Sequence, residues 1–258
     1  MSEDMELALQ ARGLTRVFGD LVAVDHIDLS VPRGSLYGFL GPNGAGKSTT
    51  IKCLTGLLRP SAGQIRILDR DPWAEPVEVK RQVGVVPEDL ALFERLSGVE
   101  TLSFVGQVHG LDKPTIRSRS EQLLSMMDLE RAGDSLVTDY SHGMRKKLAL
   151  AVALLPAPRV LFLDEPFEGI DAVASQQIRS LMLSFVKSGG TIFLTSHILE
   201  IVDRLCDRIG VIHEGRMVAE GSTEELRQGT EGGRTVEEVF LELVGAGDEA
   251  MPDLEWLQ

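Results

Sequence analysis

Short apolar runs separated by helical patterns recur along the chain and predict strands that alternate with helices. Four runs are short enough for buried strands: Leu36–Leu40, Val83–Val86, residues 160–163 and residues 191–195. Between the last two, Ala172–Lys187 has a helical pattern that ends at two glycines. Strand–helix–strand alternation predicts an α/β domain with a parallel sheet, because parallel strands need crossover connections.

Other parts of the chain have different patterns. Residues 7–11 and 22–31 alternate apolar and polar positions, which predicts a half-exposed antiparallel sheet. Residues 89–158 hold mostly helical patterns and are predicted to form a helical insert between two parts of the α/β core, residues 1–88 and 159–228. The predicted helices of the insert span residues 99–109, 114–127 and 143–155. Residues 229–258 form a tail with a short predicted helix at 236–244.

A glycine-rich segment directly follows the first of these strands. Residues 41–49 read G-P-N-G-A-G-K-S-T and fit the spacing G-x-x-x-x-G-K-[S/T]. A helical pattern over residues 49–58 completes a strand–loop–helix unit. Glycine lets the backbone approach a ligand closely, and N–H groups at a helix N-terminus attract anions. The segment is therefore predicted to hold phosphates.

Two carboxylates follow a second buried strand. The run V-L-F-L-D-E-P places Asp164 and Glu165 at its carboxyl end, the edge at which open α/β sheets bind ligands. His197 follows another strand to the same edge, and Ser196 before it is expected to cap the next helix. Together with a phosphate loop, the carboxylate pair predicts a site that holds Mg²⁺ and polarises water.

A second anion site is predicted where residues 140–144 read Y-S-H-G-M. Ser141 stands at the position of a helix N-cap. The segment is either an ordinary serine-capped helix start or a place where a hydroxyl and free N–H groups face a phosphate together. The residues alone leave both interpretations open.

Taken together and in this order, the motifs resemble those of the ATP-binding subunits of ABC transporters, over about residues 6–226. The resemblance implies an α/β fold of the P-loop NTPase type: a mixed sheet with flanking helices, an antiparallel β subdomain and a helical subdomain insert. It implies ATP hydrolysis as the activity. The matching motifs are the Walker A loop (41–49), the Walker B strand (160–165), the signature (140–144), the D-loop (169–171) and the switch histidine (His197).

The resemblance also implies how the nucleotide is bound. Phe18 matches the aromatic residue that stacks on adenine, although it lacks the hydroxyl of the tyrosine that is more common there. His197 would contact the γ-phosphate. The Walker A residues would hold the phosphates of ATP: Gly41, Pro42, Asn43, Gly44, Ala45, Gly46, Lys47, Ser48 and Thr49.

The implied catalytic and metal roles fall on acidic residues. Glu165 resembles the general base that orients the attacking water. Ser48 and Glu88 would bind Mg²⁺, and Asp164 would support the ion through water. Glu88 departs from the family pattern, which usually has glutamine there, and it adds a negative charge near the γ-phosphate.

The family pairs two ATPase subunits head to tail, so that the signature of one closes over the ATP of the other. Ser141, Gly143, Met144 and Asp171 would make these contacts in trans. The implied partners are a second ATPase subunit, identical or different, and an integral membrane permease. Residues 88–96 would form the groove that receives the permease; the apolar Leu92 and Phe93 there either dock it or anchor the helical insert.

Three departures or extensions indicate a branch of the family. They are Glu88, the signature S-H-G-M and the tail sequence V-E-E-V-F-L-E-L, which together resemble exporters of drugs, lipids and polysaccharides. The alternative is a soluble ABC-type ATPase, for example one that serves iron–sulfur cluster assembly. The apolar residues of the docking groove and the tail favour transport.

Composition limits the kinds of molecule that this protein is expected to bind. The formal net charge of −13 argues against nucleic acid, because phosphate backbones attract excess Lys and Arg. The first residues, M-S-E-D-M-E, do not resemble a signal peptide, and prolines interrupt the longest apolar stretch, so any membrane role is expected to come through a partner chain. The resemblance implies a location at the cytoplasmic face of the membrane, through the permease. Cys53 and Cys206 lack metal-ligand spacing and are expected to be reduced, buried thiols.

Overall fold

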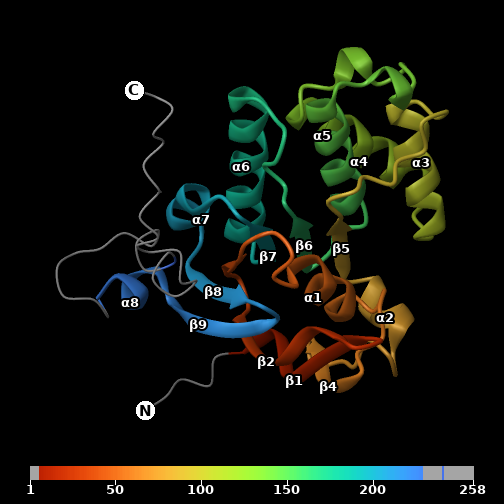
Figure 1. The fold of residues 1–258 in the computed structure, drawn as a ribbon. Coiled ribbons are helices and arrows are strands. Elements are labelled where there is room, and N and C mark those ends of the chain that lie inside the picture. The colour runs from red at the N-terminus through yellow and green to blue at the C-terminus, as the bar shows by residue number, and fades with distance from the viewer. Residues whose placement is uncertain (1–5, 229–239, 241–258) are drawn as a thin grey trace, which may run out of the picture.

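The structure is a computed structural model that describes residues 6–228 and residue 240. The helix predicted at 236–244 therefore lies, apart from Phe240, outside the described residues. A six-stranded sheet lies at the centre, in the order β5-β6-β7-β3-β8-β9 (Figure 1). Its strands are β3 (Leu36–Leu40), β5 (Val83–Val86), β6 (Val160–Asp164), β7 (Thr191–Ser196), β8 (Arg208–His213) and β9 (Arg216–Ser222).

Five of these strands are parallel, and only β9 pairs antiparallel, with β8. The four strands expected from apolar runs are thus confirmed within one or two residues. β8 and β9 were not predicted. Polar residues and glycines interrupt their pattern, and β9 is an edge strand with alternating exposure, so neither has a continuous apolar run.

A second sheet of three antiparallel strands has the order β2-β1-β4. The alternating segments near the N-terminus form its long strands, which confirms the predicted antiparallel pairing. Its bounds are β1 (Leu7–Phe18), β2 (Leu21–Pro32) and β4 (Ala62–Ile67). β4 was not predicted, because its first three residues are exposed and include a glycine.

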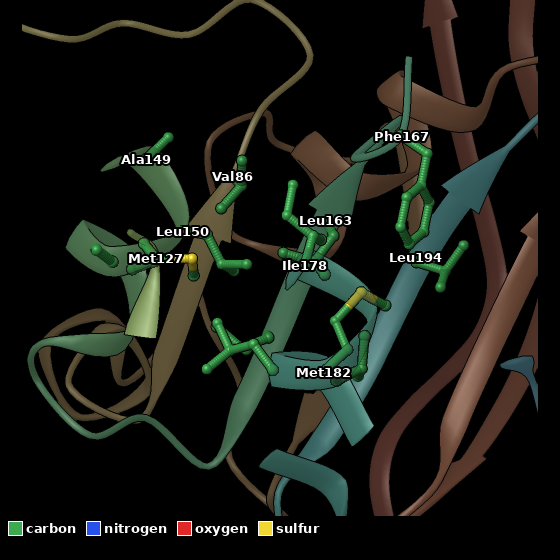
Figure 2. Packing of buried hydrophobic residues seen from close by; sticks show 14 of the residues in the cluster. Val86, Met127, Ala149, Leu150, Leu163, Phe167, Ile178, Met182 and Leu194 are labelled. Carbon is green, nitrogen blue, oxygen red and sulfur yellow. The ribbon is translucent and has the colours of Figure 1, made fainter. Parts of the chain in front are cut away.

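The central sheet separates two hydrophobic clusters. Along β6, Leu161 and Leu163 belong to one cluster, whereas Val160 and Phe162 belong to the other. This alternation explains why the strand is apolar at every position: both of its faces are covered. On the helical side, Leu163 and Leu194 lie against Ile178 and Met182 of α6 (Figure 2).

The opposite face of the central sheet packs towards the antiparallel sheet. Phe193 is the centre of an aromatic cluster there, with the rings of Tyr37, Phe39 and Phe162 5.4 to 5.7 Å from its own. All four side chains are fully buried. Two of these aromatic residues come from β3, one from β7 beside it and one from β6 beyond β7, so the cluster joins three consecutive strands of the sheet.

The helices cover the central sheet and fill the insert. Their bounds are α1 (Lys47–Leu54), α2 (Pro76–Lys80), α3 (Gly98–Val108), α4 (Lys113–Met126), α5 (His142–Leu154), α6 (Ala172–Lys187), α7 (Leu199–Leu205) and α8 (Thr223–Gln228), with 3₁₀ turns at Glu130–Ala132 and Val137–Asp139. The prediction that the first helix runs to residue 58 is wrong. It ends at Leu54, and Gly56 follows in the left-handed region with φ of 71°, a common way for a helix to stop.

α3, α4 and α5 lie between β5 and β6 in sequence and gather beyond the β5 edge of the sheet (Figure 1). Their bounds agree with the predicted helices within about one residue. Ser97 and Glu100 start α3 with reciprocal hydrogen bonds, 2.8 and 3.1 Å long. The exact division into core, insert and tail stays a prediction. Among the described residues, no helix combines the length and apolar character needed to cross a bilayer.

Candidate functional site

The order of the central strands brings three sequence motifs to one edge of the sheet. β7 lies between β6 and β3, with Asp164 opposite Thr195 and Leu40 opposite Ser196. The carboxyl ends of these three strands therefore meet. The glycine loop after β3, the acidic pair after β6 and His197 after β7 emerge side by side.

The loop of residues 41–49 needs glycine for steric reasons. Gly46 has a φ of 105° and N-caps α1, and a Cβ there would lie 2.5 Å from the carbonyl oxygen of Ala23. A Cβ at Gly41 would lie 2.4 Å from the carbonyl oxygen of Ile212. The side chain of Lys47 folds back onto the start of the loop, because its Nζ donates to the carbonyl oxygens of Gly41 (2.8 Å) and Pro42 (3.3 Å).

A pocket of about 500 Å³ lies over this edge. Its lining comes from the glycine loop, the antiparallel sheet, and the ends of β5, β6 and β7. It is lined by Phe18, Leu21, Ala23, Asn43, Gly44, Gly46, Lys47, Ser48, Thr49, Glu88, Glu165, Glu168 and His197. Gly41, Pro42 and Ala45 lie outside this lining: the first two accept from Lys47, and Ala45 is buried.

Phe18 forms part of the pocket wall at the end of β1. Its side chain is 42% exposed, so it is a surface aromatic rather than a core residue. The guanidinium carbon of Arg16 lies 4.3 Å from the centre of the ring, a cation–π contact. One face of the ring is thus fixed by Arg16, and the ring lines the same pocket as the glycine loop.

Glu165 is the most constrained side chain of the site. It is 4% exposed, and its backbone lies in the left-handed region with φ of 47°, which is uncommon for a residue with a side chain. Its Oε1 lies 3.2 Å from Lys47 Nζ, and its Oε2 lies 3.0 Å from Nδ1 of His197 and accepts from the His197 N–H at 3.3 Å. The carboxylate is thus held between a cation and an imidazole.

Thr195 links the two acidic residues. Its hydroxyl donates to Oδ1 of Asp164 at 2.6 Å and accepts from the backbone N–H of Glu165 at 3.1 Å. Asp164 is buried and does not line the pocket. Its position fits a supporting role behind the pocket rather than direct contact with a ligand.

Ser48 and Glu88 bring oxygen atoms together at the pocket wall. The Ser48 hydroxyl donates to Oε2 of Glu88 at 3.4 Å. Hydroxyl and carboxylate oxygens suit Mg²⁺. Within the described part of the chain, no three His, Cys, Asp or Glu side chains gather closely enough to hold a metal ion by themselves. A magnesium ion here would need the phosphates of a nucleotide to complete its ligands.

The signature residues lie elsewhere. Ser141 N-caps α5, and its hydroxyl accepts from the Met144 N–H at 3.3 Å. A Cβ at Gly143 would lie 3.9 Å from Oδ2 of Asp171, so the starts of α5 and α6 are neighbours. Neither these three residues nor Asp171 line the pocket.

Asp171 begins α6 as its N-cap and accepts from the N–H groups of Val173 and Ala174. The hydrogen bond from Ala174 is the main reason why the pKa of Asp171 lies below its usual value. The predicted capping by Ser196 is wrong: Ile198 is the N-cap of α7, and the Ser196 hydroxyl accepts instead from the Ile198 N–H at 2.9 Å.

Three residues of the site were missed by sequence reasoning. Thr195 has no chemical pattern of its own inside an apolar strand, although its register opposite Asp164 follows once the two strands are paired. Glu168 lies in the loop after the acidic pair and lines the pocket. Lys146 is buried in α5, and its Nζ donates to the backbone oxygens of Glu165 and Glu168. No spacing rule predicts a buried lysine of this kind.

Comparison with known proteins extends these findings. The family described as "ABC transporter" matches residues 24–168. The daunorubicin/doxorubicin resistance ATP-binding protein DrrA of Streptomyces peucetius is 41% identical over 220 residues, which are 85% of this chain and 67% of that protein. The Nod factor export ATP-binding protein I of Cupriavidus metallidurans is 39% identical over 248 residues, which are 96% and 80% of the two chains.

A solved structure of the ATP-binding subunit of an ABC transporter superposes with a TM-score of 0.86. It is 32% identical to this chain, and the match covers 92% of this chain and 99% of that one. These similarities span the glycine loop, the acidic pair and the signature. The chain therefore belongs to the ABC transporter family, as an ATP-binding subunit that hydrolyses ATP.

Proposed function

We propose that this subunit powers export through a separate membrane permease, by a cycle in which ATP joins two ATPase subunits and hydrolysis releases them. The observation that carries the proposal is the division of the site. Lys47, Glu165 and His197 converge in one pocket, whereas the helix start at Ser141 lies outside it. The drug-resistance and Nod factor export proteins among its relatives support export as the direction.

The pocket fits ATP. Phe18 offers a ring face for adenine, and the glycine loop presents backbone N–H groups and the Lys47 ammonium to the phosphates. A bound triphosphate would compete for the ammonium that now lies beside Glu165. Mg²⁺ would be held by Ser48 and Glu88, with Asp164 behind them, and would neutralise charge that builds up on the phosphates.

The other polar residues of the pocket have roles in the hydrolysis step. Glu165 acts as the general base that orients and deprotonates the attacking water. Its side chain is almost fully buried, and it lines the pocket in which the water would lie. His197 holds Oε2 of Glu165 at 3.0 Å, and it would contact the γ-phosphate of a bound nucleotide. Thr195 fixes the backbone of Glu165 through its N–H. The chain thus supplies base, imidazole and phosphate cradle from three neighbouring strand ends.

The second half of each site comes from another subunit. Ser141, Gly143 and Met144 open a thirteen-residue helix whose N-terminus carries partial positive charge, and Asp171 caps the helix beside it. In a head-to-tail pair, this helix end would face the γ-phosphate held by the partner. Two such sites form in a C₂ dimer of identical chains, and a mixed pair would use the same contacts.

The permease would dock beside the helical insert. Leu92 packs against the core, so it anchors the segment, whereas Phe93 is exposed and its ring meets that of Phe104 in a T-shaped contact, with ring centres 5.1 Å apart. We therefore assign the anchoring role to Leu92 and the docking role to Phe93. Attachment through this surface would place the subunit at the cytoplasmic face of the membrane, without any role for nucleic acid.

The dimer can be tested directly. Glu165→Gln incubated with ATP and Mg²⁺ should elute from size-exclusion chromatography at twice the monomer mass, and the double variant with Ser141→Ala should not. A Glu165→Gln protein that stays monomeric, or a dimer that is indifferent to Ser141, contradicts closure in trans. Co-purification from detergent extracts tests transport: an integral membrane protein should accompany the tagged chain, whereas recovery of only iron–sulfur assembly proteins contradicts the proposal.

A further inference from the structure

Lys146 lies where α5 meets the loop after β6. The proposed binding of phosphate and hydrolysis by water give this lysine no role. It belongs to the second turn of α5 and is 4% exposed. Its Nζ donates to the backbone oxygen of Glu165 at 2.7 Å and to that of Glu168 at 2.6 Å. One ammonium therefore bridges α5 and the loop that follows β6.

A charge in this position needs a reason. Burial lowers the pKa of the Lys146 ammonium, although the carboxylates of Glu168 and Glu165 favour its charged form. An apolar side chain would fill the space without the cost of removing a charge from water. An apolar side chain could not donate hydrogen bonds to the carbonyl oxygens of Glu165 and Glu168, whereas the Lys146 ammonium does. The lysine is therefore needed for its contact with this loop.

The loop that Lys146 holds has an unusual backbone. Glu165 lies in the left-handed region, and its carbonyl oxygen also accepts from the Glu168 N–H at 3.3 Å, which closes a tight turn. A residue other than glycine keeps such a backbone conformation only where the surrounding structure enforces it. Thr195 holds the N–H of Glu165, and Lys146 holds its carbonyl oxygen, so the peptide groups on both sides of the side chain are fixed.

We propose that Lys146 is a positioning residue for Glu165 and links the signature end of α5 to the general base of the same chain. The inference rests on the proposed function. Ser141 and Lys146 belong to one continuous helical segment, and the loop held by Lys146 leads on to Asp171 at the start of α6. A shift of α5, caused by phosphate bound to Ser141 in the partner's site, is therefore passed to Glu165 in this chain's own site.

The neighbouring lysine provides a matched control. Lys147 is buried on the same turn, but its Nζ lies 3.2 Å from Oε1 of Gln177 in α6 and makes no hydrogen bond to the Glu165 loop. Replacement of either lysine by methionine removes one buried ammonium and keeps an unbranched side chain of similar length. Lys146→Met therefore removes the contact of α5 with the loop after β6, whereas Lys147→Met removes its contact with α6.

The first test compares steady-state ATPase kinetics of the two variants. Lys146→Met should lower kcat about 10- to 100-fold with the KM for ATP nearly unchanged, as expected for a misplaced catalytic group. Lys146→Arg should recover part of the loss, because it restores a cationic donor, and Lys147→Met should keep kcat close to that of the parent. Equal losses in both methionine variants, or an unchanged kcat in Lys146→Met, would overturn the inference.

A double-variant cycle separates this inference from the proposed function. If Lys146 acts through Glu165, Lys146→Met should add no further loss of kcat to Glu165→Gln. An additive loss, with Glu165→Gln itself strongly impaired, overturns the inference and leaves the proposed function intact. Normal turnover in Glu165→Gln removes Glu165 as the base and overturns both.

Discussion

The Nζ of Lys47 and Oε1 of Glu165 lie 3.2 Å apart, and both side chains are almost fully buried. The lysine at the end of the glycine loop and the acidic residue after β6 are thus in contact, although they follow different strands. The contact exists because β7 is the only strand between β3 and β6, so the ends of their loops converge. An anion bound at Lys47 would therefore act directly on the surroundings of Glu165. Under the proposed function, this contact would connect nucleotide binding with catalysis.

Replacing Glu165 by glutamine should stop hydrolysis while ATP still binds. The amide keeps the size of the side chain but cannot accept the proton of the attacking water, so we expect kcat to fall at least about 100-fold. Phosphate release measures turnover, and equilibrium binding of a fluorescent ATP analogue measures affinity. Near-normal turnover would remove Glu165 as the base.

Replacing Lys47 by alanine should weaken nucleotide binding. The change removes the cation that faces the phosphates, and a lost hydrogen bond to a charged group corresponds to a loss of affinity of about 10- to 100-fold. Isothermal titration with ATP in the presence of Mg²⁺ provides the measurement. An ATP affinity equal to that of the parent would contradict a phosphate-binding role for this lysine.

Replacing Glu88 by glutamine should preserve ATPase activity. The amide oxygen can still serve as a ligand for Mg²⁺, and the change removes a negative charge near the phosphates. We expect turnover close to that of the parent when ATPase rates are measured over a series of Mg²⁺ concentrations. Complete loss of activity at every concentration would mean that the carboxylate has another role in the reaction.

Phe18 should contribute binding energy through its ring. Phe18→Ala removes the stacking surface, and base–aromatic stacking of about 1–3 kcal/mol predicts ATP binding weakened about tenfold or more. Phe18→Tyr keeps the ring and serves as the control, with affinity close to that of the parent. Binding of inorganic triphosphate should be equal in all three proteins, since it has no base; a loss there would point to distortion of the pocket instead.

The two buried cysteines should be unreactive in the folded protein. Burial raises the pKa of the Cys53 thiol from 9.0 to about 11 and raises that of Cys206 well above its usual value. Because the thiolate is the reactive form, a colorimetric thiol reagent at pH 8 should titrate neither cysteine in the native state and both in denaturant. Rapid labelling of either thiol in the native protein would show that it is not enclosed.

The same shift has a consequence for stability. The folded state keeps the thiol protons that the unfolded chain releases above the ordinary pKa of 9.0. The stabilisation from Cys53 is therefore complete below that pH and is lost as the pH rises towards about 11. Cys53→Ala, compared with the parent in denaturant titrations across this range, should show a smaller decline.

The local parts of the site could be read from the chain itself. The glycine loop before α1, the acidic pair after β6 and the capping role of Ser141 each depend on residues that are close in sequence, so their spacing could predict these local structures. The buried strands were predictable for the same reason, since a strand covered on both faces must be apolar throughout. The capping by Ser196 failed as a prediction because the turn after β7 places Ile198 at the helix start.

Tertiary structure decided which of these pieces meet. The order β6-β7-β3 brings Lys47, Glu165 and His197 together, and the side-chain register opposite Asp164 gives Thr195 its role. Lys146 is the clearest case, because a lysine in a helical pattern is normally solvent-exposed and only the packing of α5 on the β6 loop buries it. Spacing along the chain determines local conformation and chemistry, whereas contacts between distant segments depend on how the strands pair and the helices pack.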